Sequence, residues 1–185
     1  MSGTQTQERV IESVRRWVRS FVIDMNLCPF ARRELDAQRV RFVVTGASDV
    51  GGLLTVLAAE LALLDHEPGV ETTLLIHPGA LADFLDYNDF LADADELLRS
   101  LDREGVYQIA SFHPHYQFHG TLPEDAENYT NRSPYPMLHL LREDSVERAI
   151  AGYPEVEQIP SRNTDYLNRL GREQLARLRQ ACLSP

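Results

Sequence analysis

Apolar residues recur every three or four positions along several long segments of the chain, a spacing that is typical of one buried face of an amphipathic helix. In the first of these segments the recurring residues are Val10, Val14, Trp17, Val18, Phe21, Val22 and Met25. The pattern predicts helices over residues 7–25, 49–65, 80–103 and 162–181. Pro29 either ends the first helix or opens a short second one.

Shorter runs rich in β-branched and aliphatic residues separate these helices and predict strands. They cover residues 40–44, 72–76 and 106–111, and the run at 72–76 is typical of a strand buried on both faces. Residues 137–141 fit either type of element. We favour a fourth strand, because Asp144-Ser-Val-Glu147 resembles a capping box that opens a new helix.

Strands and helices alternate along most of the chain, and this order predicts right-handed crossovers and parallel strands. We therefore expect an α/β fold with a mainly parallel sheet of three to four strands and helices packed on it. The N- and C-terminal helices should flank that sheet. The length of 185 residues and the 43% content of hydrophobic residues fit one domain, residues 1–185.

The charge of the chain limits its partners. It has 18 basic and 28 acidic residues, a formal net charge of −10. Such a surface repels phosphate backbones and anionic membranes, so we expect a small-molecule ligand rather than a nucleic acid or a membrane. The longest apolar stretch, residues 53–64, contains Glu60 and is too short to cross a bilayer. The N-terminal residues lack a secretory signal pattern, and we expect a cytoplasmic protein.

Histidines follow two of the predicted strands. His77 comes directly after the strand at 72–76, and His113 follows the strand at 106–111. Parallel strands bring their carboxyl ends to one edge of a sheet, where open α/β folds bind ligands. We therefore expect His77 and His113 to lie on the same side of the molecule and to act there as catalytic groups.

A long loop, residues 112–135, carries further candidate groups. Loops of more than about 12–15 residues are usually functional or disordered, and the aromatic content of this one favours an ordered loop. Three of its histidines have a spacing that suits a divalent metal such as zinc or iron. They are His113, His115 and His119. Glu124 or Asp125 could add an oxygen ligand. The alternative is that these histidines pack and hydrogen-bond locally.

The second half of the loop holds candidate ligand-binding residues. They are Asn128, Tyr129, Asn131 and Arg132. Arginine binds carboxylates and phosphates in a bidentate manner, and asparagines can orient a substrate. There is a structural alternative as well, since asparagines build turns and a loop arginine often fixes only its own loop.

Cys28 is a second candidate catalytic centre. It lies at a helix N-terminus if Pro29 is the first helical residue. Backbone N–H groups at such a position stabilise a thiolate and lower its pKa, and a loop histidine could then act as the base. The alternative is a buried structural cysteine.

Five segments together form a distinctive signature. They are residues 26–31 (NLCPFA), 71–78 (ETTLLIHP), 87–91 (YNDFL), 111–118 (SFHPHYQF) and 128–143 (NYTNRSPYPMLHLLRE). The segments resemble those of an uncharacterised bacterial family, domain of unknown function 1415, and the resemblance covers nearly the whole chain. It implies a bacterial cytoplasmic protein and carries over no activity and no residue role.

Taken together, these features predict a small-molecule enzyme of the hydrolase or lyase type. Its site would be lined by histidines, would be a candidate for metal binding, and would lie at the carboxyl edge of the sheet. The histidines would act as base or metal ligands, and Arg132 would hold an anionic group. Two alternatives remain open: a thiol-dependent enzyme that uses Cys28, and a non-enzymatic binding module that uses loop 112–135.

Overall fold

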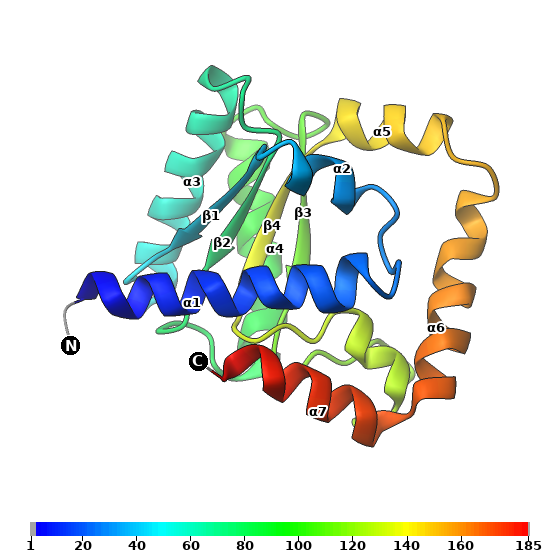
Figure 1. Ribbon diagram of the computed structural model, residues 1–185. Helices are drawn as coiled ribbons and strands as arrows, with labels where there is room; N and C mark the ends of the chain where they lie inside the picture. The colour runs from blue at the N-terminus through cyan, green and yellow to red at the C-terminus, as the bar shows by residue number, and fades with distance from the viewer. Residues whose placement is uncertain (1–2, 185) are drawn as a thin grey trace.

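The protein folds around a four-stranded sheet with helices on both faces, as seen in a computed structural model that describes residues 3–184 (Figure 1). The strands are β1 (Val40–Val44), β2 (Thr72–Ile76), β3 (Tyr107–Phe112) and β4 (Met137–Arg142). The α-helices are α1 (Gly3–Trp17), α2 (Ala31–Asp36), α3 (Val50–His66), α4 (Phe84–Ser100), α5 (Glu143–Ala151), α6 (Ile159–Leu170) and α7 (Arg172–Leu183). Three further segments are η1 (Val18–Ile23), which is π-helical, and the 3₁₀ turns η2 (Ala126–Thr130) and η3 (Val156–Gln158). The mixed α/β class is confirmed, and each predicted strand lies within one residue of its expected bounds.

The direction of β4 differs from the prediction. The strands lie in the order β1-β2-β4-β3; β1 and β2 are parallel, and β4 is antiparallel to both of its neighbours. The expectation of a mainly parallel sheet was therefore wrong. A long loop precedes β4 instead of a crossover helix, so the chain can turn back beside β3. Because β1, β2 and β3 still point the same way, their carboxyl ends share one edge.

Alternating side chains give the sheet two different faces. On one face, Leu75 and Leu138 pack under α3 and α4. On the other face, Leu74 and Met137 pack against α1, η1, α6 and α7. Figure 1 shows α1 crossing in front of the sheet, with α2 and α5 above it. Several helical elements therefore cover different parts of the second face. The pocket described below lies on this face.

The N-terminal helix changes its form before it ends. It begins at Gly3, earlier than predicted, and from Val18 onward the chain is a π-helix. The Asp24 N–H bonds to the carbonyl of Arg19, five residues earlier, at 2.8 Å. Such wide turns are rare and frequently occur at functional sites. The next helix, α2, begins two residues after Pro29, so Cys28 lies in the connection between η1 and α2.

Two expectations for the C-terminal part were wrong. Asp144 does not open a capping box, because α5 already begins at Glu143 and its N-cap residue, Arg142, makes no side-chain cap bond. The helix predicted over residues 162–181 is two helices, α6 and α7, which meet at Gly171. Gly171 has φ 77° and ψ 153°, a conformation that is essentially restricted to glycine. The chain therefore turns sharply between two helices, although the spacing of apolar residues predicts a single helix.

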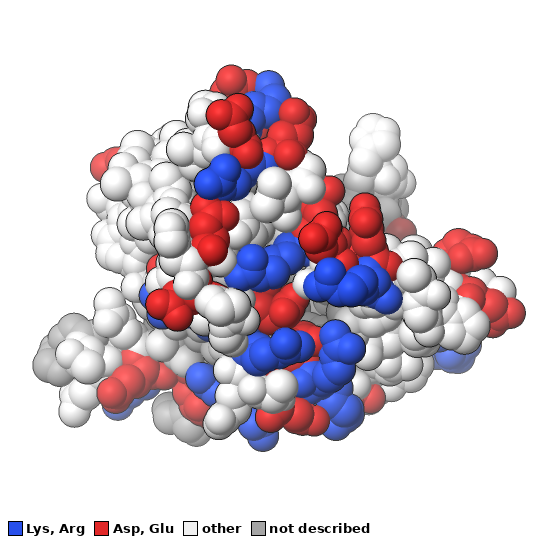
Figure 2. All heavy atoms as spheres, turned by 90° about the horizontal axis from the view of Figure 1, so that it is seen from above, with Lys and Arg blue, Asp and Glu red and all other residues white. Residues whose placement is uncertain are grey.

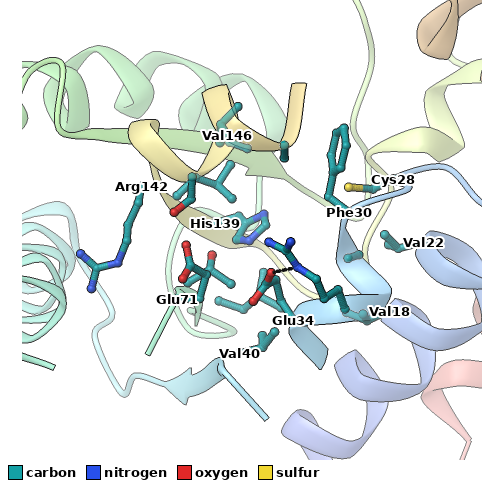
Figure 3. A pocket seen from close by; sticks show the side chains of 18 of the residues that line it. Val18, Val22, Cys28, Phe30, Glu34, Val40, Glu71, His139, Arg142 and Val146 are labelled. Carbon is teal, nitrogen blue, oxygen red and sulfur yellow. Dashed lines mark hydrogen bonds and ion pairs between the residues drawn. The ribbon is translucent and has the colours of Figure 1, made fainter. Parts of the chain in front are cut away.

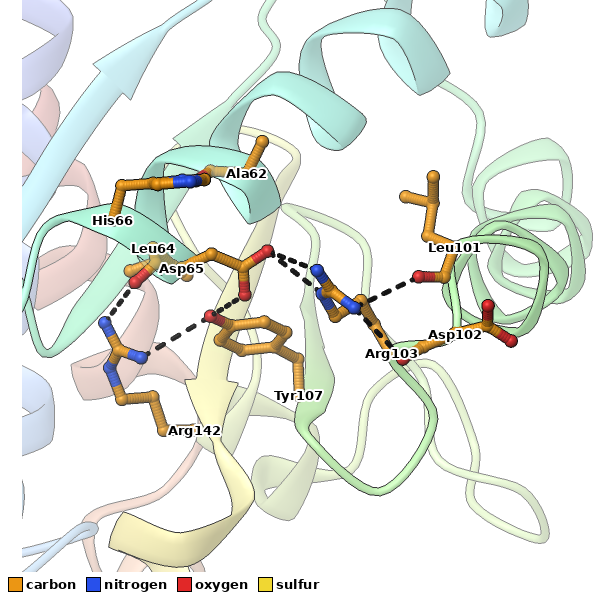
Figure 4. Close-up of polar contacts among 9 residues, drawn as sticks. All are labelled: Ala62, Leu64, Asp65, His66, Leu101, Asp102, Arg103, Tyr107 and Arg142. Atoms are coloured by element: carbon orange, nitrogen blue, oxygen red, sulfur yellow. Dashed lines mark hydrogen bonds and ion pairs between the residues drawn. The ribbon is translucent and has the colours of Figure 1, made fainter.

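A polar network closes the end of the sheet where β3 begins and β4 ends (Figure 4). Asp65, near the end of α3, accepts hydrogen bonds from Arg103 Nε at 3.0 Å and from Tyr107 Oη at 2.9 Å. The bond from Arg103 is the main reason why the pKa of the Asp65 carboxyl is lowered. Arg142, the last residue of β4, donates to two carbonyls in and just after α3. Its guanidinium is thereby held on the α3 side of the sheet.

Replacing Gly171 with alanine should lower the free energy of unfolding by about 1–3 kcal/mol, because alanine is strained at this φ and ψ. A Cβ at Gly171 meets no atom within 4 Å, so the backbone conformation is the whole cause. Urea unfolding followed by circular dichroism measures the change. Gly46→Ala is the matched control, since its Cβ is equally free of contacts but its φ is not positive. That change should stay within about 0.5 kcal/mol, and equal losses at both positions would refute the explanation.

Candidate functional site

The two histidines that were expected to share an edge of the sheet do lie together, both against Tyr87. The ring of His77 stacks on that of Tyr87 with centroids 5.8 Å apart, and the ring of His113 lies 5.0 Å from it. Tyr87 comes from α4. Its hydroxyl donates to the Met137 carbonyl at 2.9 Å and accepts from the Phe112 N–H at 2.9 Å. The tyrosine therefore ties β3 and β4 together beside the two histidines.

Neither of these histidines is open to a substrate, since both are fully buried. The Nε2 of His113 lies 3.1 Å from the Leu81 carbonyl, and its Nδ1 accepts from the His115 N–H at 3.0 Å. His77 bonds through Nδ1 to the Ala80 carbonyl at 3.1 Å, and its Nε2 is buried without a partner. Burial lowers the pKa of His77 to about 4 and also lowers that of His113. This cluster has the character of a packed core.

The three loop histidines are not brought together as ligands. His115 and His119 are exposed, whereas His113 is buried with both ring nitrogens already hydrogen-bonded. Asp125, one of the acidic residues expected to complete a site, accepts from the Leu122 N–H at 2.8 Å. Within residues 3–184, no group of three or more histidine, cysteine, aspartate or glutamate side chains is placed to hold a metal ion. The arrangement gives no support to the zinc or iron expectation.

The other candidates in the loop hold the loop itself in shape. Asn128 is fully buried, and its side-chain amide makes hydrogen bonds of 2.8 to 2.9 Å to three groups of the same loop. Asn131 donates to the carbonyl of a β3 residue at 3.0 Å. Arg132 donates to two loop carbonyls at 2.9 and 2.7 Å, and its guanidinium lies 4.9 Å from the centre of the buried Tyr129 ring. These groups therefore match the structural alternative.

A pocket of about 320 Å³ opens on the face of the sheet that faces η1 (Figure 3). The sheet forms its floor, and η1, α2 and α5 form its walls. Most of the lining is apolar: Trp17, Val18, Val22, Phe30, Ala31, Val40, Leu74, Ala110, Phe112, Leu141, Val146 and Ala149. Ligand sites usually measure roughly 300–1,000 Å³, so this one suits a small molecule. It lies over the amino-terminal halves of β1 and β2, away from the carboxyl edge where a site was expected.

His139 is the histidine on the floor of this pocket. It stands on β4 directly between Leu74 of β2 and Ala110 of β3, and the small Ala110 leaves room beside the ring. Burial alone lowers the pKa of His139 to about 4, and no residue of the described range, 3–184, hydrogen-bonds to the ring. A neutral imidazole has one donor and one acceptor nitrogen. The ring of His139 lines the cavity and has neither nitrogen bonded to a residue of the described range.

His139 was not among the predicted site residues. The signal that could have found it is its place in Met137-Leu-His-Leu-Leu141, where it is the one ionisable residue of an otherwise apolar run. By alternation it shares a face with Met137 and Leu141, which is a core-facing position. A polar residue at such a position needs a partner or a cavity.

Two glutamates lie at one end of the pocket, and they differ in how closely arginines pair with them. Glu34 of α2 accepts from Arg33 Nε at 2.7 Å and is also bonded to Arg39. Glu71, just before β2, is less well paired: its Oε2 lies 3.6 Å from Arg39 Nη1, and its Oε1 is buried without a partner. Figure 3 shows Glu34 and Glu71 at the same end of the pocket as His139. Figure 2 looks onto this end of the molecule and shows basic and acidic residues interspersed around its middle.

Cys28 lines the same pocket, on the side of Phe30 and Val22 (Figure 3). Hydrogen bonds from the backbone of Phe30 and Ala31 act to lower the pKa of its thiol, as the position before a helix suggests. Desolvation is the larger effect, and the net result is a raised pKa. The lowered pKa on which the thiolate hypothesis depends is therefore not found.

Comparison with known proteins gives a family but no function. Residues 9–177 match the family described as a protein of unknown function, DUF1415. No curated protein and no solved structure matches the chain. Over residues 3–184, the helices are all too short or too polar to cross a bilayer. The pocket is therefore the feature of the molecule from which a function can be proposed.

Acid should destabilise the fold between about pH 6.5 and pH 4, because the pKa values of His77 and His139 are about 4 in the folded chain against an ordinary 6.5. In this window the unfolded chain takes up protons that the folded chain excludes, so the free energy of unfolding falls as the pH falls. Above pH 6.5 both groups are neutral in both states and contribute no pH dependence. Each histidine accounts for up to about 3 kcal/mol at pH 4. Urea unfolding at a series of pH values measures the loss.

The His139→Leu variant distinguishes the contribution of His139 to the pH dependence of stability from that of the fully buried His77. The variant should lose a substantial part of the pH dependence, while His77 and His113, whose pKa values are also lowered, retain the rest. It should also be at least as stable as the natural chain at neutral pH, because leucine needs no hydrogen-bond partner. An unchanged pH dependence in this variant would mean that His139 accepts protons freely in the folded state.

Cys28 should react slowly with iodoacetamide below neutral pH, because burial raises the pKa of its thiol and the thiolate is the reactive form. The Cys182→Ser variant leaves Cys28 as the single cysteine. Mass spectrometry then compares the labelling rate of the folded variant with that of the same variant in urea. We expect the folded rate to be clearly lower than the rate in urea, because burial raises the pKa of the thiol in the folded chain. Faster labelling in the folded state would revive the thiol hypothesis.

Proposed function

Since the chain belongs to the DUF1415 family, which is described as of unknown function, we propose a function from its pocket. The protein binds a small, mainly apolar molecule between the sheet and helices α2 and α5. One observation carries the proposal: an apolar pocket of about 320 Å³ contains a histidine, His139, that has no hydrogen-bond partner within residues 3–184. A small molecule is thus the proposed partner.

The arrangement is unfavourable for the protein alone. Apolar surface left in contact with water forgoes about 25 cal/mol for each Å² that could be buried. The ring of His139 is partly buried and has no hydrogen-bond partner within residues 3–184, so a ligand can supply one. A ligand that fills the pocket and bonds to His139 therefore covers apolar surface and satisfies the ring. Local departures from ideal packing and pairing of this kind are expected at functional sites.

Binding is better supported than catalysis. A histidine whose pKa is about 4 is a weak proton acceptor at neutral pH, and burial raises the pKa of the Cys28 thiol. His77 and His113, the residues of the hydrolase or lyase hypothesis, are fully buried. The binding-module hypothesis keeps its general form, but the pocket replaces loop 112–135 as the binding surface.

Binding of N-phenyl-1-naphthylamine, a neutral fluorescent probe, tests the proposal. Its fluorescence should rise when the natural chain takes it up into an apolar site. Ala110→Leu places a larger side chain on the pocket floor beside His139 and should weaken binding at least about tenfold, a loss of about 1.4 kcal/mol. The affinity is measured by titration, and circular dichroism checks that the variant is folded.

Ala92→Leu is the matched control for this experiment. It makes the same substitution at an exposed position of α4, which packs on the opposite face of the sheet. This variant should bind the probe as the natural chain does. The proposal fails if the natural chain does not bind the probe, or if Ala110→Leu and Ala92→Leu bind it equally well.

A further inference from the structure

The charged end of the pocket indicates which class of molecule it takes. We propose that the ligand carries a hydrogen-bond-donating head, an amine or an alcohol, on its apolar body, and that Glu71 accepts a hydrogen bond from this head next to His139. This inference rests on the proposed function and adds to it the chemistry of the ligand.

The carboxylate of Glu71 lacks a hydrogen-bond donor, and a ligand could supply one. Its Oε1 is buried with no partner, and its Oε2 lies 3.6 Å from Arg39 Nη1, which is longer than a hydrogen bond. Burying a carboxylate oxygen without a donor is unfavourable. The last torsion of a glutamate side chain is soft, so a small rotation can present either oxygen to the pocket that Glu71 lines. An N–H or O–H group of a ligand would satisfy it.

The arginines near the pocket do not favour an anionic ligand. Arg33 and Arg39 are both paired with Glu34. Arg142 donates to carbonyls on the α3 side, and its guanidinium lies 5.8 Å from the centre of the Tyr107 ring (Figure 4). The pocket lining holds two carboxylates, Glu34 and Glu71, as well as Arg33 and Arg142, and Glu71 is the least well paired of these charges. A carboxylate ligand next to Glu71 would therefore meet a like charge, which is costly.

His139 completes the recognition of a donor head. Its ring is neutral at physiological pH, so it offers an acceptor nitrogen to a second N–H or O–H and gives no attraction to an anion. Figure 3 shows His139 and Glu71 on one side of the pocket, and Val22, Phe30 and Cys28 on the other. The pocket thus has a polar end for the head and an apolar end for the body of one small molecule.

Three ligands with one body and different heads test the inference. They are 4-phenylbutylamine, 4-phenyl-1-butanol and 4-phenylbutyrate, each measured at pH 7.5 by displacement of N-phenyl-1-naphthylamine. The amine and the alcohol should bind at least about tenfold more tightly than the carboxylate. An amine that binds more tightly than the alcohol identifies an ion pair with Glu71, and equal binding identifies a neutral hydrogen bond. A carboxylate that binds as well as the other two overturns the inference.

Glu71→Gln tests the residue. Glutamine keeps the shape and removes the charge, so the variant should bind the carboxylate more tightly and lose any preference for the amine over the alcohol. Glu173→Gln makes the same change of charge at an exposed position of α7 and should keep the ranking of the natural chain. An unchanged ranking in folded Glu71→Gln rules out Glu71 as the acceptor. If Glu71→Gln does not fold, the ranking of the three heads by the natural chain still decides the inference.

Failure of this inference can be told apart from failure of the proposed function. If the three heads bind equally and Ala110→Leu weakens them all, the pocket binds small molecules but does not select a donor head. If none of the three displaces the probe and Ala110→Leu has no effect on probe binding, the pocket is not a binding site.

Discussion

The antiparallel placement of β4 between β2 and β3 determines where the chemistry of this fold can lie. Because of it, His139 stands in the interior of the sheet, between Leu74 and Ala110, rather than at an edge. The same placement separates the carboxyl ends of β2 and β3 by one strand. Tyr87 joins the main chains of β3 and β4 there, and the two neighbouring histidines are packed against it. The direction of β4 thus leaves His77 and His113 in a packed cluster and places His139 on the floor of the pocket.

The two faces of the sheet differ in how fully helices cover them. On the face of α3 and α4, long leucine-rich helices supply a continuous core. On the other face, several short elements meet at different angles, and the pocket remains between them. Polar groups follow the same division: Arg142 donates to carbonyls on the α3 side, whereas His139 and Glu71, which line the pocket, have side-chain atoms without a hydrogen-bond partner.

Local spacing in the sequence predicted the strands and most of the helices, but not the strand directions or the contacts between elements. The strands at 40–44 and 72–76 were predicted to the residue, because apolar runs and their flanking turns are local signals. The direction of β4 depends on how a long loop folds, which no local pattern records. Likewise, the spacing of the loop histidines cannot show that a ring nitrogen of His113 is hydrogen-bonded to the carbonyl of Leu81, a residue distant in the sequence. His139 was missed for the converse reason, since a single histidine in a strand gains meaning only from the cavity above it.

The π-helical turn in η1 makes the pocket depend on the length of the chain as well as on its composition. A π turn holds one residue more than an α turn, and two of the pocket residues, Val18 and Val22, belong to η1. Deleting one residue there would let the helix continue with regular hydrogen bonds, but everything after it would rotate by about 100° around the helix axis. The connection that carries Cys28 and Phe30 would then leave the pocket wall. In the history of such a fold, a pocket could therefore be opened or closed by the gain or loss of one codon, with every lining residue unchanged.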